Sequence, residues 1–434
     1  MNILMFTNTY CPIVGGVSES VQRLKRCLQR QGHSVLIVAP KLDGQPRFER
    51  DVVRVVAMQR FNGSDFSLPV PVPGQLYEAI EAFQPDLVHA HHPFLLGDTA
   101  ARVAQTYGLP LIFTHHTLYE HYTHYVPGDS PRMQRFAIAL ASEYTRLCDA
   151  VIAPSESIAE LLAQRGVRAE KVRVIPSGVD TRTFAQGDGG RWRQRFGIPD
   201  DAMVVGHVGR LAMEKNLDFL AAALARFLAR HPKARALIVG EGEARMAMHE
   251  HAAREGVADR FHYTGKLHDQ ALIDAYHAMD AFAFASHSET QGMVIAEAMA
   301  AGLPVVAINA SGVREVLRDG VNGIMLPGDD IDAFANALET LQSSARREAL
   351  RQGALESAHA FDERRCAERC LTVYRQVLEA ETSAAERDDG AWEKVRGRLE
   401  AEWRLLRHRG RVLRSVFQTL PVSETPPVEE VPSK

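Results

Sequence analysis

The chain has 434 residues, 46% of them hydrophobic and 24% charged, and its formal net charge at pH 7 is −4. This length predicts two or three globular domains with a large core, and the balanced charge excludes a general attraction to nucleic acid. No stretch approaches the roughly 18 apolar residues of a membrane-spanning helix, so we expect any membrane contact to be peripheral.

The start of the chain and the cysteines predict the same compartment. The first residues lack the basic start and long apolar stretch of a secretory signal peptide. The five cysteines are scattered and lack metal-type spacing. Cys366 and Cys370 lie four residues apart in a helical pattern, which predicts one buried face. We therefore expect reduced thiols and a cytoplasmic protein.

The first part of the chain alternates short apolar runs with helical patterns. The predicted buried strands are Ile3–Phe6, Ser34–Ala39, Leu87–Ala90, Leu111–Thr114 and Ala150–Ala153. The predicted helices are Ser18–Arg30, Leu76–Ala82, Leu95–Tyr107, Arg132–Leu147 and Ser155–Gln164. This alternation is typical of βαβ units and predicts a doubly wound parallel sheet, which the turn-rich stretch Ile175–Asp180 interrupts.

A second series with the same alternation follows. Its predicted strands are Val204–Val208, Ala236–Val239, Phe261–Thr264, Ala281–Ala285, Val305–Ile308 and Gly323–Leu326. Its predicted helices are Leu217–His231, Arg245–Glu255, Gln270–Ala278, Val294–Ala300 and Asp332–Leu341. The fold class is therefore α/β, with two Rossmann-like domains that face each other across a cleft at the carboxyl ends of both sheets.

The predicted domain organisation follows from these patterns. The two domains are expected at residues 1–176 and 177–362, and a helix at 363–381. A basic amphipathic helix is predicted at 391–420, and the Pro- and Glu-rich tail 421–434 is predicted to be disordered.

Two loops of the first domain carry candidate site residues. Gly15 and Gly16 follow the first strand and precede a helix, where glycines let backbone amides approach a ligand, although a simple tight turn would use them too. His115 and His116 end the strand at Leu111–Thr114. Other histidines lie nearby along the chain: His89, His91, His92, His121 and His124. His89 and His91 could present two imidazoles on one strand face, but no neighbouring Cys or carboxylate completes a recognisable zinc site.

A loop of the second domain carries two cations. Gly209 and Arg210 follow a predicted strand, and Lys215 comes five residues later. A fixed guanidinium and ammonium in such a loop can bind an anionic ligand. The alternative is two solvated loop side chains. Gly240, in a Gly-Glu-Gly turn, and Lys266 follow the next two strands.

The stretch Ser286–Pro304 carries two carboxylates. Glu289 lies in a loop, and Glu297 lies in the second turn of a helix that starts near Gly292 and ends at Gly302. Eight residues at helical rise put the carboxylates on the order of 12 Å apart, beyond the roughly 5–9.5 Å of glycosidase pairs. This separation suits two ends of one polar ligand whose anionic middle lies on the first amides of the helix. An ordinary acidic first turn is the alternative.

The spacing Glu289-x7-Glu297, followed by Ala-Met-Ala-Ala-Gly-Leu-Pro-Val-Val, resembles the signature of retaining glycosyltransferases of the GT-B fold. The resemblance continues in order from the first loop to about residue 380. It implies that Glu289 binds donor-sugar hydroxyls, that Glu297 binds the nucleotide ribose, and that no metal is needed. It also implies front-face transfer with retention, and a helix at 363–381 that packs back on the first domain.

The resemblance implies roles for the other candidates as well. Residues implied at the donor nucleotide-sugar are Gly16, Gly209, Arg210, Lys215, Gly240, Lys266, Gly292, Met293 and Val294. Gly15, Gly16 and His116 are implied near the acceptor, with His116 close to the anomeric carbon, while His115 is expected to be a packing neighbour. The catalytic set is therefore expected to be His116, Arg210, Lys215 and Glu289.

Two segments narrow the implied acceptor. The stretch from His116 to Tyr125 and the run Glu289-Thr290-Gln291-Gly292 resemble bacterial diacylglycerol glucosyltransferases. This resemblance implies a UDP-sugar donor, transfer of a hexose such as glucose to a membrane lipid, and Tyr119 at the acceptor. One departure is His91-His92-Pro93-Phe94, where that group often has Thr and Glu. A soluble or polyprenyl-linked saccharide acceptor, a nucleotide-sugar epimerase and a non-catalytic partner remain as alternatives.

Two basic segments are expected to favour an anionic membrane surface. The helix Ser18–Arg30 has four basic side chains against one acid, and Ala391–Leu420 has eight against three, with Trp392 and Trp403 among them. Basic amphipathic helices with Trp bind anionic interfaces well. We therefore expect peripheral association with the inner face of the cell membrane, and docking on a protein partner is the alternative.

Overall fold

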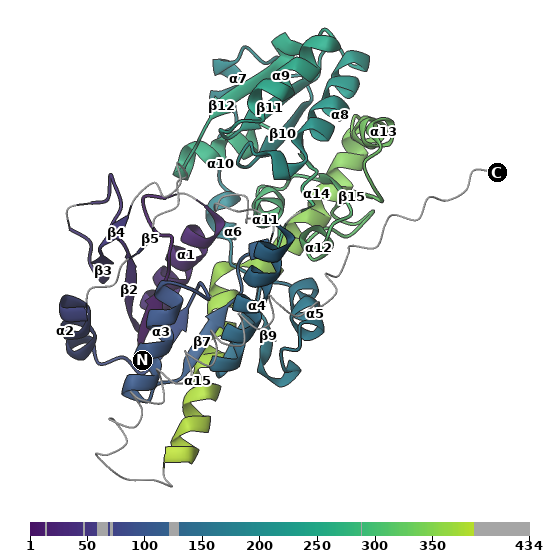
Figure 1. Ribbon diagram of the computed structural model, residues 1–434. Helices are drawn as coiled ribbons and strands as arrows, with labels where there is room; N and C mark the ends of the chain where they lie inside the picture. Colours follow the sequence, from purple (N-terminus) through teal and green to yellow (C-terminus); the bar gives the residue numbers. More distant parts are fainter. Residues whose placement is uncertain are drawn as a thin grey trace.

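The computed structural model of the chain describes residues 1–13, 15–46, 48–58, 68–69, 73–120, 130–287 and 289–385. These residues form two α/β lobes, and the helix α15 (Glu363–Ala385) runs back along the first lobe (Figure 1). The predicted segments 391–420 and 421–434 lie outside the described residues. Within the described part of the chain, no helix is both long and apolar enough to cross a membrane.

The first lobe is built on a seven-stranded parallel sheet of order β3-β2-β1-β6-β7-β8-β9. Its strands are β1 (Asn2–Phe6), β2 (Ser34–Pro40), β3 (Val52–Val55), β6 (Leu87–Ala90), β7 (Leu111–Thr114), β8 (Ala150–Ala153) and β9 (Val172–Val174). The central strands are buried on both faces, so both faces need helices. The helices of this lobe are α1 (Gly16–Arg30), α2 (Pro73–Phe83), α3 (Leu96–Tyr107), α4 (Pro131–Leu147) and α5 (Glu156–Gln164). Two short strands, β4 (Ala57–Met58) and β5 (Leu68–Pro69), pair beside it.

The second lobe is built on a six-stranded parallel sheet of order β12-β11-β10-β13-β14-β15. Its strands are β10 (Val204–Val208), β11 (Arg235–Val239), β12 (Phe261–Gly265), β13 (Ala281–Phe284), β14 (Val305–Ile308) and β15 (Gly323–Leu326). Numbered within the lobe, this is the 3-2-1-4-5-6 order of a Rossmann fold, whose ligand crevice lies at the reversal between its first and fourth strands. That reversal here falls between β10 and β13.

The helices of the second lobe cover both faces of this sheet. They are α6 (Thr181–Phe184), α7 (Gly190–Arg195), α8 (Leu217–Arg230), α9 (Arg245–Arg254), α10 (Asp269–His277), α11 (Met293–Ala300), α12 (Ser311–Arg314), α13 (Ile331–Thr340) and α14 (Ser344–Ala358). One apolar cluster packs α8, α9 and α13 on one face, and a second packs α10, α11 and α14 on the other. The predicted α/β architecture with two Rossmann-like domains is confirmed.

The helix α15 joins the end of the second lobe to the first lobe. Its buried residues Cys366, Cys370 and Tyr374 lie in one apolar cluster with β1, β2 and α1. Tyr374 also places its hydroxyl 2.8 Å from His89 Nδ1 at the end of β6. The two cysteines share the buried face that their spacing predicted, and all five thiols are unbridged.

The basic side chains of α1, which the sequence analysis expected at a membrane surface, have polar partners within the protein. Arg23 pairs with Glu19 and Glu297, while Arg26 and Arg30 both pair with Glu363 at the start of α15. Lys25 Nζ donates to the carbonyls of Arg50 and Asp51. These bases of α1 therefore also pair with groups of the protein itself, and membrane contact through this helix stays a prediction.

Candidate active site

A cleft of about 890 Å³ lies between the two lobes and is lined by residues of both. It collects the carboxyl ends of β10, β11 and β13 from the second lobe and the loops after β1 and β7 from the first. Every predicted site residue except Tyr119 lines it: Gly15, Gly16, His116, Gly209, Arg210, Lys215, Gly240, Lys266, Glu289, Gly292, Met293, Val294 and Glu297. Predicted site residues from both lobes and from loops far apart in the chain thus share one cavity.

A glycine turn after β11 packs closely against the loop after β10 on one side of the cleft. A Cβ atom at Gly240, whose φ is +138°, would lie 1.9 Å from the carbonyl oxygen of Gly209. The neighbouring amide of Leu211 donates to the carbonyl of Glu241 at 2.8 Å. Only glycine permits this approach, so Gly240 holds the loop that carries Arg210 in place.

The cations of that loop are held by carboxylates. Lys215 Nζ lies 2.7 Å from Glu289 Oε1, and both side chains are mostly buried. Arg210 pairs with Glu214 and keeps almost half of its side chain exposed. A lysine and a carboxylate fixed against each other in a cleft can serve a negatively charged group and a hydroxyl that are neighbours in one ligand.

Glu289 lies just before the amino terminus of α11. Gly292 caps this helix in the left-handed region, with φ +70°, and Met293 starts it. The backbone groups at the start of a helix favour a bound anion. The helix end, Lys215 and Arg210 are therefore groups of this cleft that can bind an anion.

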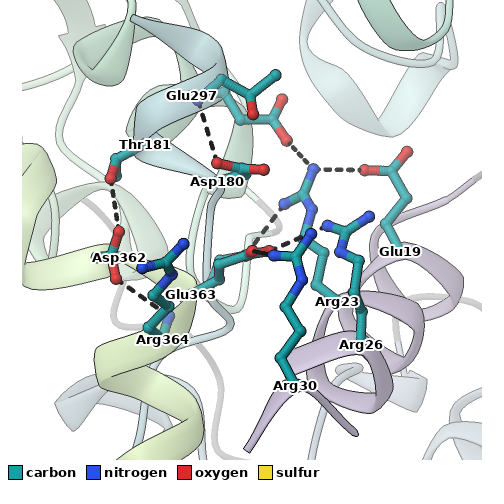
Figure 2. Close-up of polar contacts among 12 residues, drawn as sticks. Glu19, Arg23, Arg26, Arg30, Asp180, Thr181, Glu297, Asp362, Glu363 and Arg364 are labelled. Atoms are coloured by element: carbon teal, nitrogen blue, oxygen red, sulfur yellow. Dashed lines mark hydrogen bonds and ion pairs between the residues drawn. The ribbon is translucent and has the colours of Figure 1, made fainter. Parts of the chain in front are cut away.

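Glu297 lies in the second turn of α11 and is buried. Its Oε1 accepts from Arg23 of α1 at 2.7 Å, and its Oε2 accepts from the hydroxyl of Tyr276 at 3.1 Å. Figure 2 shows the guanidinium of Arg23 reaching Glu297 from the opposite lobe. The carboxylate that the sequence singled out is thus fixed on both oxygens.

His116 approaches the cleft from the end of β7. Its Nε2 lies 2.9 Å from His91 Nδ1, and Thr290 Oγ1 donates to its backbone carbonyl at 3.0 Å. Burial and the neighbouring histidines hold the pKa of His116 well below its usual 6.5. The imidazole is therefore neutral near pH 7, and one of the two rings donates this hydrogen bond to the other. His115 beside it is fully buried, as expected of a packing residue.

The loop that carries Glu289 is also bound to the first lobe. Ser155 Oγ donates to the carbonyl of Thr290 at 2.7 Å. The side-chain amide of Gln291 bonds both backbone groups of Ser177, at 2.6 and 3.1 Å. Thr290 therefore ties this loop to the first lobe, and Gln291 ties it to the segment that joins the two lobes.

The sequence analysis did not identify some residues of the site. Arg23 and Glu19 lie on α1, where they read as an exposed basic face and its counter-ion. His207 ends β10 and lines the cleft, and burial lowers its pKa to about 4. The buried end of a parallel strand is a signal that could have identified His207, whereas nothing local marks Arg23.

Tyr119 does not line the cleft. Its ring packs edge-on against Phe94 and His115, at centroid distances of 5.2 and 5.8 Å. The structure therefore does not bring it to the predicted acceptor position. Residues 121–125 complete the motif that suggested a lipid acceptor, and they lie outside the described part of the chain.

Both ring nitrogens of His89 and Nδ1 of His91 have hydrogen-bond partners within the protein. The rings of His89 and His91 have centroids 4.2 Å apart and planes tilted by 37°, and His89 bonds Tyr374 and Thr114. Among the described residues, no group of three or more His, Cys, Asp or Glu side chains is arranged to hold a metal ion. His121 and His124 lie outside those residues.

Comparison with known proteins identifies the family of the chain. Residues 14–183 match the model of Glycosyltransferase Family 4, and residues 189–357 match that of Glycosyl transferases group 1. The chain is 30% identical to an alpha-monoglucosyldiacylglycerol synthase of Streptococcus pneumoniae, over 79% of this chain and 78% of that protein. It is 32% identical to a GDP-mannose-dependent alpha-mannosyltransferase of Mycobacterium tuberculosis, over 81% of this chain and 90% of that protein.

The fold has matching solved structures. The structure of HepE from Anabaena in complex with UDP and glucose superposes with a TM-score of 0.68 and 24% identity, covering 88% of this chain and 100% of that one. At this identity the match concerns the fold alone. Together with the family models, it shows that the chain belongs to the glycosyltransferases of the GT-B fold, close to the diacylglycerol glucosyltransferases.

Proposed function

We propose that the chain transfers a hexose, glucose in the first instance, from a UDP-sugar to a membrane lipid such as diacylglycerol, with retention of anomeric configuration. The observation that carries this proposal is the contact between Lys215 and Glu289, whose side chains lie 2.7 Å apart in the cleft. In a nucleotide-sugar, the diphosphate and the sugar hydroxyls flank the bond that breaks. A cation and a carboxylate side by side match that arrangement.

The chemistry assigned to the cleft is electrostatic. The acceptor oxygen bonds to the anomeric carbon as the bond from that carbon to the phosphate oxygen breaks. The acceptor proton passes to an oxygen of the departing diphosphate, so charge and atoms balance. Lys215, Arg210 and the start of α11 stabilise the diphosphate, Glu289 binds hydroxyls of the sugar, and His116 lies at the acceptor side.

This mechanism gives the two carboxylates of the signature a binding role. Glu289 is paired with Lys215, and Glu297 is paired with Arg23. An ion pair orients a carboxylate as a hydrogen-bond acceptor. Neither has to act as a nucleophile in front-face transfer. The reaction is also proposed to need no metal ion.

The lipid acceptor rests on the similarity to alpha-monoglucosyldiacylglycerol synthase and on the Thr290-Gln291 run. The protein would then work at the inner face of the cell membrane without spanning it. The similarity to a GDP-mannose-dependent mannosyltransferase gives the main competing donor.

A panel of radiolabelled donors tests the proposal. UDP-glucose, UDP-galactose, UDP-N-acetylglucosamine and GDP-mannose are each offered with diacylglycerol vesicles, with total lipid extract, and with water-soluble saccharides and inositol phosphate. The expected result is label from UDP-glucose in the organic phase, unchanged by excess EDTA. Transfer of label only to a soluble acceptor would overturn the lipid assignment, and activity lost with EDTA and restored by a divalent ion would overturn the metal-free mechanism.

A further inference from the structure

Arg23 joins three segments that lie far apart in the chain. Its Nη2 lies 2.9 Å from Glu19 Oε2 in α1 and 2.7 Å from Glu297 Oε1 in α11. Its Nη1 donates to the carbonyl of Gly178, where the chain passes between the lobes, at 3.1 Å. Figure 2 shows the guanidinium between the two carboxylates. One planar cation of the first lobe thus holds a cleft carboxylate of the second.

Arg23 offsets the charge of the two carboxylates that it contacts, Glu19 and Glu297. The side chains of Arg23 and Glu297 are only 11% and 5% exposed, and Glu19 brings a second carboxylate to the same cation. Desolvation and the charge of Glu297 raise the pKa of Glu19, while Arg23 opposes the rise. Without the guanidinium, two carboxylates would repel each other in a poorly solvated site.

The geometry leaves room for a ligand on Glu297. A carboxylate offers about four acceptor positions, and Arg23 and Tyr276 occupy one on each oxygen. Glu297 itself lines the cleft. A pair of hydroxyls on neighbouring carbons could therefore bond the carboxylate while Arg23 remains in place.

We propose that Arg23 is a positioning residue for the donor: it holds Glu297 from the opposite lobe in the orientation that binds the ribose hydroxyls. The donor site is then complete only when the two lobes are in contact. This inference rests on the proposed function, because it takes the ligand of Glu297 to be the ribose of a nucleoside diphosphate.

Arg26 provides a matched control. It lies on the same helix three residues after Arg23 and also pairs with a buried carboxylate from a distant segment, Glu363, at 3.1 Å. Its side chain is 47% exposed, and its partner Glu363, unlike Glu297, does not line the cleft. A loss of lobe packing would affect variants at both positions, whereas a loss of ribose binding would affect only Arg23→Gln.

The test is the affinity of the full chain for UDP and for its 2′-deoxy and 3′-deoxy analogues, measured by titration calorimetry. If the wild type binds GDP instead, the corresponding guanosine analogues are used. A hydroxyl that bonds a carboxylate contributes about tenfold or more to affinity, so at least one deoxy analogue should bind the wild type that much more weakly. In Arg23→Gln this ratio should fall to about twofold or less, because Glu297 is no longer held. In Arg26→Gln it should stay at the wild-type value.

Each outcome decides a different point. An unchanged ratio in Arg23→Gln, an equal fall in Arg26→Gln, or a wild type that binds all analogues equally would overturn the inference. A wild type that binds neither UDP nor GDP would overturn the proposed function itself. If Arg23→Gln does not fold, Arg23→Lys retains the charge but not the planar fork, and the ratio should again fall while an unchanged ratio would contradict the inference.

Discussion

At the scale of single residues, the cleft works through charges that are paired before any ligand arrives. Lys215 is held by Glu289, and Glu297 is held by Arg23 and Tyr276. Groups that are already oriented need little rearrangement when charge develops on a ligand. The same pairing makes each partner sensitive to loss of the other.

Replacing Lys215 by Ala is expected to remove a cation from the departing diphosphate and to leave Glu289 without its partner. We predict that kcat/KM falls by about 10²–10³-fold, or roughly 3–4 kcal/mol of transition-state stabilisation. Lys233→Ala is the control, since Lys233 is exposed and pairs with Asp201 outside the cleft. Turnover of Lys215→Ala close to that of Lys233→Ala would remove Lys215 from the site.

The buried histidines predict how stability depends on pH. Burial lowers the pKa of His89 and His92 to about 3 and that of His115 and His207 to about 4, from 6.5. Below pH 6.5 the unfolded chain binds protons that the folded chain does not, so stability falls as the pH drops from 6.5 toward 4. Each such histidine contributes about 1.4 kcal/mol per pH unit.

Urea unfolding in steps from pH 7 to pH 4.5 measures this slope. His89→Gln removes one of the titrating groups, and its slope should be smaller than that of the wild type by about 1.4 kcal/mol per pH unit. Stability that is constant or rises as the pH falls through this range would contradict the neutral state of the cluster.

Single residues also mark the limit of prediction from the sequence. Glu289, Glu297, Arg210 and Lys215 follow strands or open a helix, so local pattern indicates them, and the structure brings them into one cleft. Arg23 was read as part of a basic helix face, because its partner Glu297 is 274 residues away. Contacts of that kind depend on the packing of two lobes, which no local pattern encodes.

At the scale of elements, the central strands were predicted and the edge strands only in part. The central strands β1, β6 and β7 are short apolar runs, and all their residues except Asn2 are buried. The edge strands β12 and β15 were predicted although they are only partly buried. The edge strands β3 and β9 were missed because they are only partly buried and carry Arg54 and Arg173. The helix α14 was missed because few of its residues are buried.

A buried polar contact joins the helix α15 to the first sheet. The hydroxyl of Tyr374 lies 2.8 Å from His89 Nδ1, and both residues are fully buried. Tyr374→Phe leaves that nitrogen without a partner, so we predict a loss of about 1–3 kcal/mol in the free energy of unfolding. Tyr107→Phe removes an exposed hydroxyl contact with Glu81 and serves as the control. Equal stability of the two variants would show that the contact contributes nothing.

At the scale of the whole molecule, the two lobes meet through polar contacts around the cleft. Thr290 bonds the backbone of His116, Gln291 bonds Ser177, and Arg23 bonds Glu297. The α/β class and the two-lobed architecture followed from the alternation of strands and helices. The contacts between lobes did not, because they join loops whose local sequence is compatible with many neighbours.

The segment 391–420 is the more strongly basic of the two segments predicted to contact a membrane. It lies outside the described residues, so the prediction rests on its excess of basic side chains and its tryptophans. A chain that ends at Gly390 should bind anionic vesicles more weakly than the full chain in a sedimentation assay, and the difference should shrink at high salt. Removal of 421–434 alone should leave binding unchanged. Equal binding of all three chains would exclude this segment as a membrane anchor.

The most direct test of the central account is the anomeric configuration of the first product. The account holds that Glu289 and Glu297 bind the donor and that the acceptor attacks from the face that the phosphate leaves. Proton NMR of product made from an α-linked UDP-sugar should therefore show an α linkage. A β linkage would require attack from the opposite face, with a carboxylate or histidine acting as base, and would contradict the roles assigned to the cleft.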